Sequence, residues 1–117
     1  MPDLDDFLAG LDESVRLAFE RVRDLALQVV PDADQGTSYG MAALIWRGKP
    51  LLGFNVAASH LAVHPFSPSA VDAVREQLSG FRLSKGTVRF RPETPLPEKA
   101  VLDLVRARRD EIVRRAG

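Results

Sequence analysis

Hydrophobic residues recur at helical spacing over the first third of the chain. They follow the three-and-four-residue repeat that gathers side chains on one face of a helix, and they are Leu11, Val15, Ala18, Phe19, Val22, Leu25, Ala26 and Val29. Pro31 ends the pattern, because proline lacks a backbone N–H group and clashes with the preceding turn. The sequence therefore predicts an amphipathic helix over about residues 11–30.

Short apolar runs broken by turn residues replace this pattern between residues 39 and 65. The runs are Met41 to Trp46, Leu51 to Ala57 and Leu61 to Pro65, and each has the length and composition of a strand. The segments that join them are too short for a crossover, so neighbouring strands must run antiparallel. We expect a three-stranded meander.

The C-terminal half predicts a fourth strand between two helices. Ser67-Pro68 opens a short helix that ends at Gly80, with Ser69 and Asp72 spaced as a capping box. Residues 86–91 alternate as a strand, with Val88 and Phe90 in the core, and Pro95-Leu96-Pro97 begins the last helix. The predicted order is α-β-β-β-α-β-α. The predicted fold class is α+β, a two-layer sandwich in which helices cover one face of a four-stranded antiparallel sheet.

The third strand divides its side chains between two faces of this sheet. Its two-residue period places Leu61 and Val63 on one face and His60, Ala62 and His64 on the other. One face should therefore be buried and the other partly polar.

Length and composition indicate one intracellular domain. The 117 residues, of which 45% are hydrophobic and 27% charged, suffice for a single core. We expect one domain spanning residues 1–117 with its core over about residues 8–112. Its ends, at about residues 1–8 and 114–117, should be frayed. The chain has no cysteine, no apolar run of about 20 residues and an acidic start. We expect a cytoplasmic protein without a membrane segment.

Charge is distributed unevenly although the net charge is zero. Residues 1–34 hold nine acidic and three basic residues, whereas residues 35–117 hold seven acidic and thirteen basic ones. The two parts can neutralise each other after folding, or they can face different partners. No basic run is long enough, or interleaved with enough aromatic residues, to favour nucleic acid as a partner.

The segment Ser84-Lys85-Gly86-Thr87 is the best candidate for a binding site. Hydroxyls, an ammonium and a flexible backbone can together hold an anion, although the segment lacks the glycine spacing and the following helix of a P-loop. The alternative is a turn into the fourth strand with a solvated lysine. With Tyr39, His60 and Arg89, the residues Ser84, Lys85 and Thr87 form the predicted ligand-binding set.

The sequence gives less support to metal binding and to catalysis than to ligand binding. His60 and His64 lie roughly 13 Å apart on a strand, too far to share one metal ion, and no nucleophile is paired with a base, so an enzyme is the least favoured class. The acidic residues Glu13, Glu20 and Asp24 lie on the outer face of the first helix. Their oxygen atoms suit a hard cation such as iron, and a solvated helix surface is the alternative.

Several separated motifs resemble the YdhG-like domain of unknown function. They occur in the family's order over about residues 8–112, and they are Pro31-Asp32-Ala33, Thr37-Ser38-Tyr39-Gly40-Met41, Gly48-Lys49-Pro50-Leu51, His60, Ser84 to Phe90 and Pro95-Leu96-Pro97. The resemblance implies a frataxin-like α/β sandwich. It also implies an intracellular iron chaperone, since part of that family is described as binding iron through surface carboxylates and delivering it to a partner.

Two functions thus remain open. One is an iron chaperone that uses Glu13, Glu20 and Asp24 and hands its metal to a protein partner. The other is a module that binds a small anionic ligand or a peptide on the polar sheet face. A homodimer through that face or through an edge strand is compatible with either.

Overall fold

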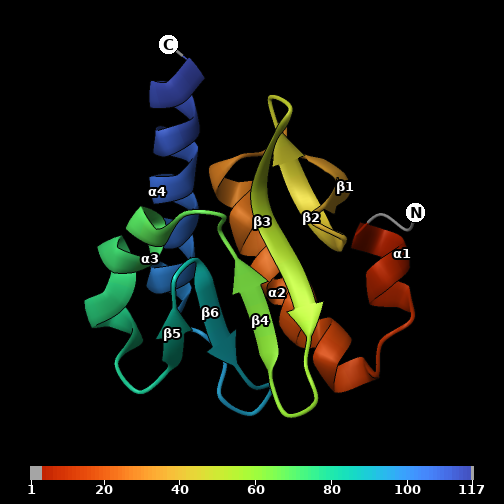
Figure 1. Cartoon of the computed structure of the whole chain (residues 1–117). Coiled ribbons are helices and arrows are strands. Elements are labelled where there is room, and N and C mark those ends of the chain that lie inside the picture. Colours follow the sequence, from red (N-terminus) through yellow and green to blue (C-terminus); the bar gives the residue numbers. More distant parts are fainter. Residues whose placement is uncertain (1–3, 117) are drawn as a thin grey trace.

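A six-stranded antiparallel sheet forms one layer of the fold, and helices cover one of its faces (Figure 1). The computed structural model describes residues 4–116. The strands are β1 (Asp34–Ser38), β2 (Met41–Trp46), β3 (Lys49–Val56), β4 (Leu61–His64), β5 (Arg82–Ser84) and β6 (Thr87–Phe90). Their order across the sheet is β1-β2-β3-β4-β6-β5, so β1 and β5 are the edge strands.

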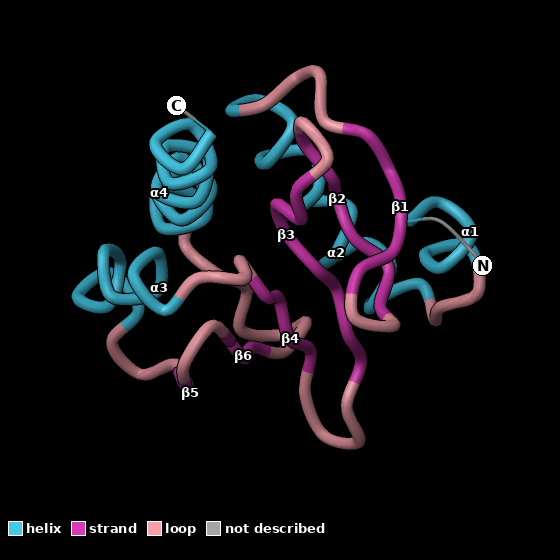
Figure 2. The backbone as a smooth tube through the Cα atoms, turned by 45° about the horizontal axis from the view of Figure 1, so that its top comes forward, coloured by secondary structure: helices cyan, strands magenta, loops and turns pink. Residues whose placement is uncertain are grey.

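Four α-helices form the second layer. They are α1 (Leu4–Ala9), α2 (Glu13–Val29), α3 (Pro68–Val74), which continues into the 3₁₀ turn η1 (Arg75–Leu78), and α4 (Glu98–Ala116). Figure 2 shows α2 passing behind β2 and β3, and α4 standing next to α3. Within residues 4–116, no helix is long and apolar enough to cross a membrane.

One hydrophobic cluster joins the two layers. Phe19 of α2 lies at its centre, with its ring edge-on to Phe54 of β3 and Phe90 of β6 at centroid distances of 5.4 and 6.0 Å. Such edge-to-face contacts add to the stability gained by burying apolar surface. The predicted core residues Val63 and Val88 are fully buried in the same cluster.

Two-residue turns set the register of the first three strands. Tyr39-Gly40 joins β1 to β2 and Arg47-Gly48 joins β2 to β3, and all four residues have positive φ angles between 52° and 77°. Positive φ at both central positions is the geometry that matches the twist of an antiparallel hairpin. Glycine adopts it freely, whereas tyrosine and arginine are held there by the pairing on either side.

The structure corrects the predicted element list in three places. The sheet has six strands and not four. The prediction missed β1, which has no hydrophobic side chain, and β5, which has only three residues, because neither shows a hydrophobic alternation. The start of the chain, expected to be frayed, contains the helix α1, in which Leu4 and Leu8 are buried. At the other end, where fraying was also expected, α4 extends to Ala116. Residues 1–3 and 117 lie outside the described chain. The cap of α3 is Ser67, which accepts a hydrogen bond from Ala70 N–H, and not Ser69.

A buried polar network connects α4 with the sheet and with α3. Arg108 and Glu111 of α4 are only 8% and 9% exposed, and they form an ion pair with each other. Arg108 also donates two hydrogen bonds, of 3.0 and 2.8 Å, to the Pro50 carbonyl of β3. The Ser67 hydroxyl donates to Glu111 at 2.9 Å. Burial by itself would raise the pKa of Glu111, but the hydrogen bonds from Ser67 and Arg108 outweigh it and lower that pKa.

We expect Arg108→Met to lower the free energy of unfolding by about 3–5 kcal/mol, because it leaves Glu111 charged and buried without its partner. Ser67→Ala should cost less, about 1–3 kcal/mol, through loss of the cap and of one hydrogen bond. Urea denaturation followed by circular dichroism measures both.

The matched control is Arg75→Met, which breaks an exposed ion pair with Asp72. The Arg75 and Asp72 side chains are 57% and 67% exposed. The effect of this variant should stay within about 0.5 kcal/mol. Equal losses in Arg108→Met and Arg75→Met would show that the buried network does not hold α4 in place.

Candidate functional site

The sheet face opposite the helices carries the candidate site. Within residues 4–116 no helix covers this open face (Figure 1). Strand register places Ala43, Gly53 and His64 side by side across β2, β3 and β4, and Thr87 of β6 continues the row beyond His64. Small residues therefore floor one half of the open face, and polar residues occupy the other.

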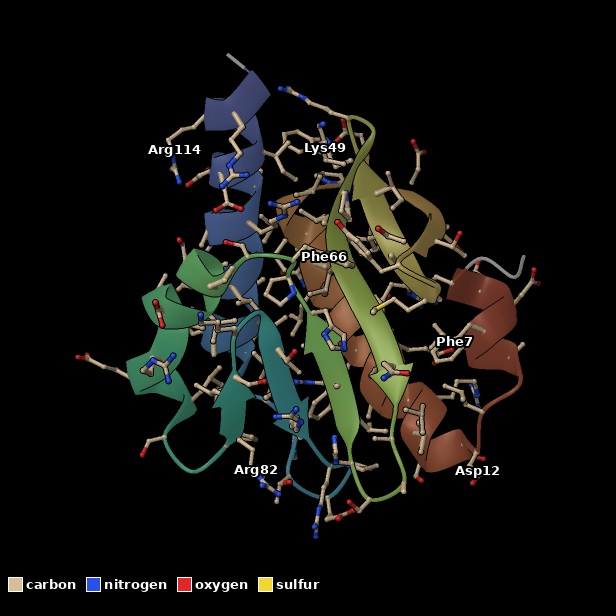
Figure 3. All side chains as sticks on the ribbon, viewed as in Figure 1. Phe7, Asp12, Lys49, Phe66, Arg82 and Arg114 are labelled. Carbon is tan, nitrogen blue, oxygen red and sulfur yellow. The ribbon has the colours of Figure 1, made fainter. Side chains whose placement is uncertain are left out.

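The Phe66 ring packs against this floor at Gly53, which has no side chain. A Cβ at position 53 would come within 2.9 Å of the Phe66 ring and 2.6 Å of the Met41 sulfur, closer than real Cβ atoms approach. Figure 3 shows Phe66 over the upper end of β4. Tyr39 stacks on the Phe66 ring at a centroid distance of 5.7 Å and an interplanar angle of 28°, yet it remains 83% exposed.

Both stacked residues have left-handed backbone conformations. The φ angles are 52° for Tyr39 and 58° for Phe66. For a bulky side chain this conformation is uncommon and costs of the order of 1–3 kcal/mol. Tyr39 owes its conformation to the hairpin turn, but Phe66 lies between a strand and a helix, where no regular turn demands it. Strain of this kind is found where a structure holds a side chain in place for binding.

The stacked rings form one wall of a hollow of about 350 Å³. We call it the aromatic hollow, and its lining residues are Tyr39, Met41, His64, Phe66, Ser67, Pro68, Lys85, Gly86 and Thr87. The side chains of Lys85 and Tyr39 are exposed, whereas those of His64 and Thr87 are partly buried. The hollow thus combines an aromatic wall with one cation and two uncharged polar groups.

His64 is the most unusual polar group of the aromatic hollow. Its Nδ1 lies 3.1 Å from Thr87 Oγ1, while its Nε2 is buried and has no hydrogen-bond partner in the described part of the chain. Burial and, secondarily, the positive charge of Arg89 lower the pKa of His64, and the Gly86 backbone opposes them more weakly. His64 is therefore a neutral imidazole near pH 7.

A second hollow of about 300 Å³ lies where β5 and β6 meet the loops that follow β3 and β6 and the turn that precedes β5. We call it the arginine hollow, and its lining residues are Ser59, His60, Gly80, Phe81, Arg82, Arg89, Phe90, Arg91 and Thr94. Figure 3 shows Arg82 at the lower end of β5, away from Phe66.

The predicted ligand-binding residues are divided between the two hollows. Tyr39, Lys85 and Thr87 line the aromatic hollow, whereas His60 and Arg89 line the arginine hollow. The sixth residue of the predicted set, Ser84, accepts a 3.3 Å hydrogen bond from Arg89.

Sequence reasoning did not select His64, Met41 or Phe66 as site residues. The alternation along β4 assigns His64 to the polar sheet face, and this is the one feature of the sequence that could have indicated it as a site residue. Phe66 has no such feature, because a single aromatic residue between Pro65 and Pro68 shows no periodicity.

The acidic residues of α2 do not gather into a metal site. Glu20 forms an ion pair with Arg16 at 3.3 Å, and Asp24 forms one with Arg23 at 3.0 Å, while Glu13 is exposed. Among residues 4–116, no group of three or more histidine, aspartate or glutamate side chains is arranged to hold a metal ion. The predicted iron site thus has no supporting geometry.

Comparison with known proteins identifies the fold. No protein-family model matches the sequence, and no curated protein is significantly similar to it. A crystal structure of a DUF1801-family protein (YdhG) from Bacillus subtilis is similar, with a TM-score of 0.74 and 20% sequence identity, and the match covers 87% of this chain and 84% of that one. The similarity confirms the α+β fold expected from the YdhG-like resemblance. It gives no support to the frataxin-like fold or to the iron role.

The lowered pKa of His64 predicts a loss of stability in mild acid. The unfolded chain takes up a proton near the ordinary value of 6.5, whereas the folded chain resists protonation until a lower pH. The free energy of unfolding should therefore be highest above pH 6.5 and fall as the pH drops below it. Asp103, whose pKa the hydrogen bonds from Lys99 and Gln77 lower to about 2, titrates in a separate, more acidic range.

Urea denaturation between about pH 7.5 and 5 measures this slope. His64→Gln should flatten it, since glutamine does not titrate. The matched variant His60→Gln removes the chain's other imidazole. Equal flattening in the two variants would contradict the assignment to His64.

Proposed function

We propose that the protein binds a small ligand in the aromatic hollow, and that the ligand carries a flat ring and an anionic group such as a carboxylate. The observation that carries the proposal is the Tyr39–Phe66 stack, in which two strained residues present an aromatic surface at the mouth of a hollow. An exposed tyrosine ring contributes little to folding. Its contact area is available for a ligand ring.

The polar groups of the hollow suit an anion. The Lys85 ammonium can reach a carboxylate at the exposed rim, and the Thr87 hydroxyl, which also contacts His64 Nδ1, can supply a hydrogen bond further in.

The state of Ser67 favours binding over catalysis. Ser67 is among the lining residues but only 2% exposed, and its hydroxyl accepts from Ala70 N–H at 3.1 Å and donates to Glu111 at 2.9 Å. Glu111 is a poor base for activating this hydroxyl, because its carboxylate is paired with Arg108 and its pKa is lowered. The hollow thus offers recognition groups without an activated nucleophile.

The iron-chaperone hypothesis rests on the resemblance alone. Two of its three carboxylates, Glu20 and Asp24, are already paired with arginines. Anaerobic titration calorimetry with ferrous iron tests it. Binding that is no tighter in the wild type than in the triple variant Glu13→Ala, Glu20→Ala, Asp24→Ala would eliminate the hypothesis.

Tyr39 allows a direct test of the proposed function, because it is the only tyrosine in the chain. Protein labelled with 3-fluorotyrosine gives a single ¹⁹F resonance at the mouth of the hollow. Titration with 2-naphthoate should shift this resonance saturably. The neutral analogue 2-naphthamide should bind more weakly, since it cannot pair with Lys85.

Variants separate the ring contact from the charge contact. Lys85→Gln should lower the affinity for 2-naphthoate by about three- to tenfold, the range of a partly screened ion pair. It should leave the affinity for 2-naphthamide unchanged. Gly53→Ala should lower the affinity for both probes, because the added Cβ displaces Phe66. The control is Lys49→Gln, which lies against α4 and outside the hollow. A resonance that does not move, or an equal loss in Lys49→Gln, would refute the proposal.

A further inference from the structure

The arginine hollow concentrates positive charge that no carboxylate neutralises. The side chains of Arg82 and Arg91 have no hydrogen-bond or ion-pair partner among residues 4–116, and the one partner of the Arg89 side chain is the uncharged Ser84 hydroxyl. Six arginines of the helices, in contrast, form ion pairs, namely Arg16, Arg23, Arg75, Arg106, Arg108 and Arg109. Arg47 and Arg114 also lack an ion pair in the described part of the chain, but this end of the sheet is distinguished by three arginines that line one hollow.

Strand register brings two of these arginines face to face. Arg82 of β5 pairs directly with Arg89 of β6, and like charges in directly opposed positions destabilise a sheet. Arg91 follows Arg89 by two residues and lines the same hollow. A bound anion with more than one negative charge would turn this repulsion into attraction.

Protection of a sheet edge explains only part of this arrangement. Charged side chains on an edge strand prevent pairing with other chains, and Arg82 on the edge strand β5 fits that role. Arg89 does not, because β6 lies inside the sheet between β4 and β5. The acidic residue nearest in sequence to Arg91 is Glu93, which does not line this hollow. It lines an adjoining hollow together with Arg91, Ser59 and His60, and it forms no ion pair with Arg91.

We infer that the arginine hollow binds the phosphate group of a small phosphate monoester. Guanidinium groups match phosphate oxygens with paired, parallel hydrogen bonds. The hydroxyls of Ser59 and Thr94 and the imidazole of His60 line the same space, and the partly buried ring of Phe81 offers an apolar contact for the organic part. A hollow of about 300 Å³ holds a molecule of that size.

The charge distribution favours a small molecule over a nucleic acid chain. The three arginines line one hollow, whereas Lys85 lines the aromatic hollow and Lys49 lies against α4. A nucleic acid strand would need a basic track that follows several successive phosphates. This site is separate from the aromatic hollow, so the two proposals can fail independently.

Phenyl phosphate and phenyl sulfate test the inference as a matched pair of ligands, because they share a shape and differ in charge above pH 7. We expect saturable binding of phenyl phosphate to the full chain by titration calorimetry at low salt, and weaker binding of phenyl sulfate. Arg82→Gln and Arg91→Gln should each lower the affinity for phenyl phosphate by about tenfold, because each removes charge-assisted hydrogen bonds. Both residues are exposed, so the variants should fold.

Two variants serve as controls. Arg114→Gln removes the same charge from an exposed position on α4, far from Arg82 (Figure 3), and should change the affinity by less than about twofold, as expected for a distant screened charge. Lys85→Gln tests whether phenyl phosphate, which also carries a ring and an anionic group, binds in the aromatic hollow instead: a loss of affinity larger than in Arg82→Gln would place it there and contradict the inference. Without ligand, Arg82→Gln should raise the melting temperature because it relieves the repulsion with Arg89.

Three other results would overturn the inference. The first is no detectable binding of phenyl phosphate. The second is an equal loss of affinity in Arg114→Gln and Arg82→Gln, which would indicate unspecific attraction. The third is tighter binding of a short single-stranded oligonucleotide with the same dependence on Arg82 and Arg91, which would assign the arginines to a nucleic acid.

Discussion

The buried contact between Arg108 and Glu111 determines how the helical layer meets the sheet. Arg108 binds the Pro50 carbonyl at the start of β3, and Glu111 accepts from the Ser67 hydroxyl at the start of α3. A buried ion pair adds little net stability, because desolvation offsets its attraction. Its contribution is geometric. It allows one position of α4 relative to the sheet and one position of the Ser67-Pro68 segment. That segment forms a wall of the aromatic hollow, and Phe66 immediately precedes it. The polar network on the helical side therefore positions the aromatic stack on the open side.

The open face combines two chemistries at its two ends. Phe66 lies over the upper end of β4 with Tyr39 stacked on it, and Arg82 marks the lower end of β5 (Figure 3). Arg89 couples the two ends. It lines the arginine hollow, donates to Ser84, and helps to lower the pKa of His64 in the aromatic hollow. An anion bound to Arg89 would screen its charge and so weaken that effect on His64. The two hollows are separate in space but linked electrostatically through one side chain.

The sequence predicts the apolar part of this fold well and the polar part poorly, for a physical reason. Burial on one face imposes a hydrophobic period, so α2, β2, β4 and β6 can be located from Phe19, Val63, Val88 and their neighbours. The strand β1 carries no such period, because it consists of four polar residues and a glycine, and it is held by backbone pairing with β2. Tyr39, Lys85 and Thr87 could be selected by residue type and position in a turn. Phe66 could not, since its place depends on the missing side chain of Gly53, which is 13 residues earlier in the chain and adjacent in space.

The contacts that stabilise the fold and the features that lower its stability lie on opposite faces of the sheet. On the helical side, apolar side chains fill one cluster, and the buried charges of Arg108 and Glu111 are paired. On the open side, the structure holds left-handed Phe66, a buried imidazole nitrogen without a partner, and Arg82 opposite Arg89. Each of these features lowers stability, and none is required by the packing of the core. Features that lower stability persist in a folded protein where another requirement maintains them, and they collect at functional sites. Their concentration on the one face that the helices leave uncovered is therefore the strongest structural reason to regard that face as the binding surface.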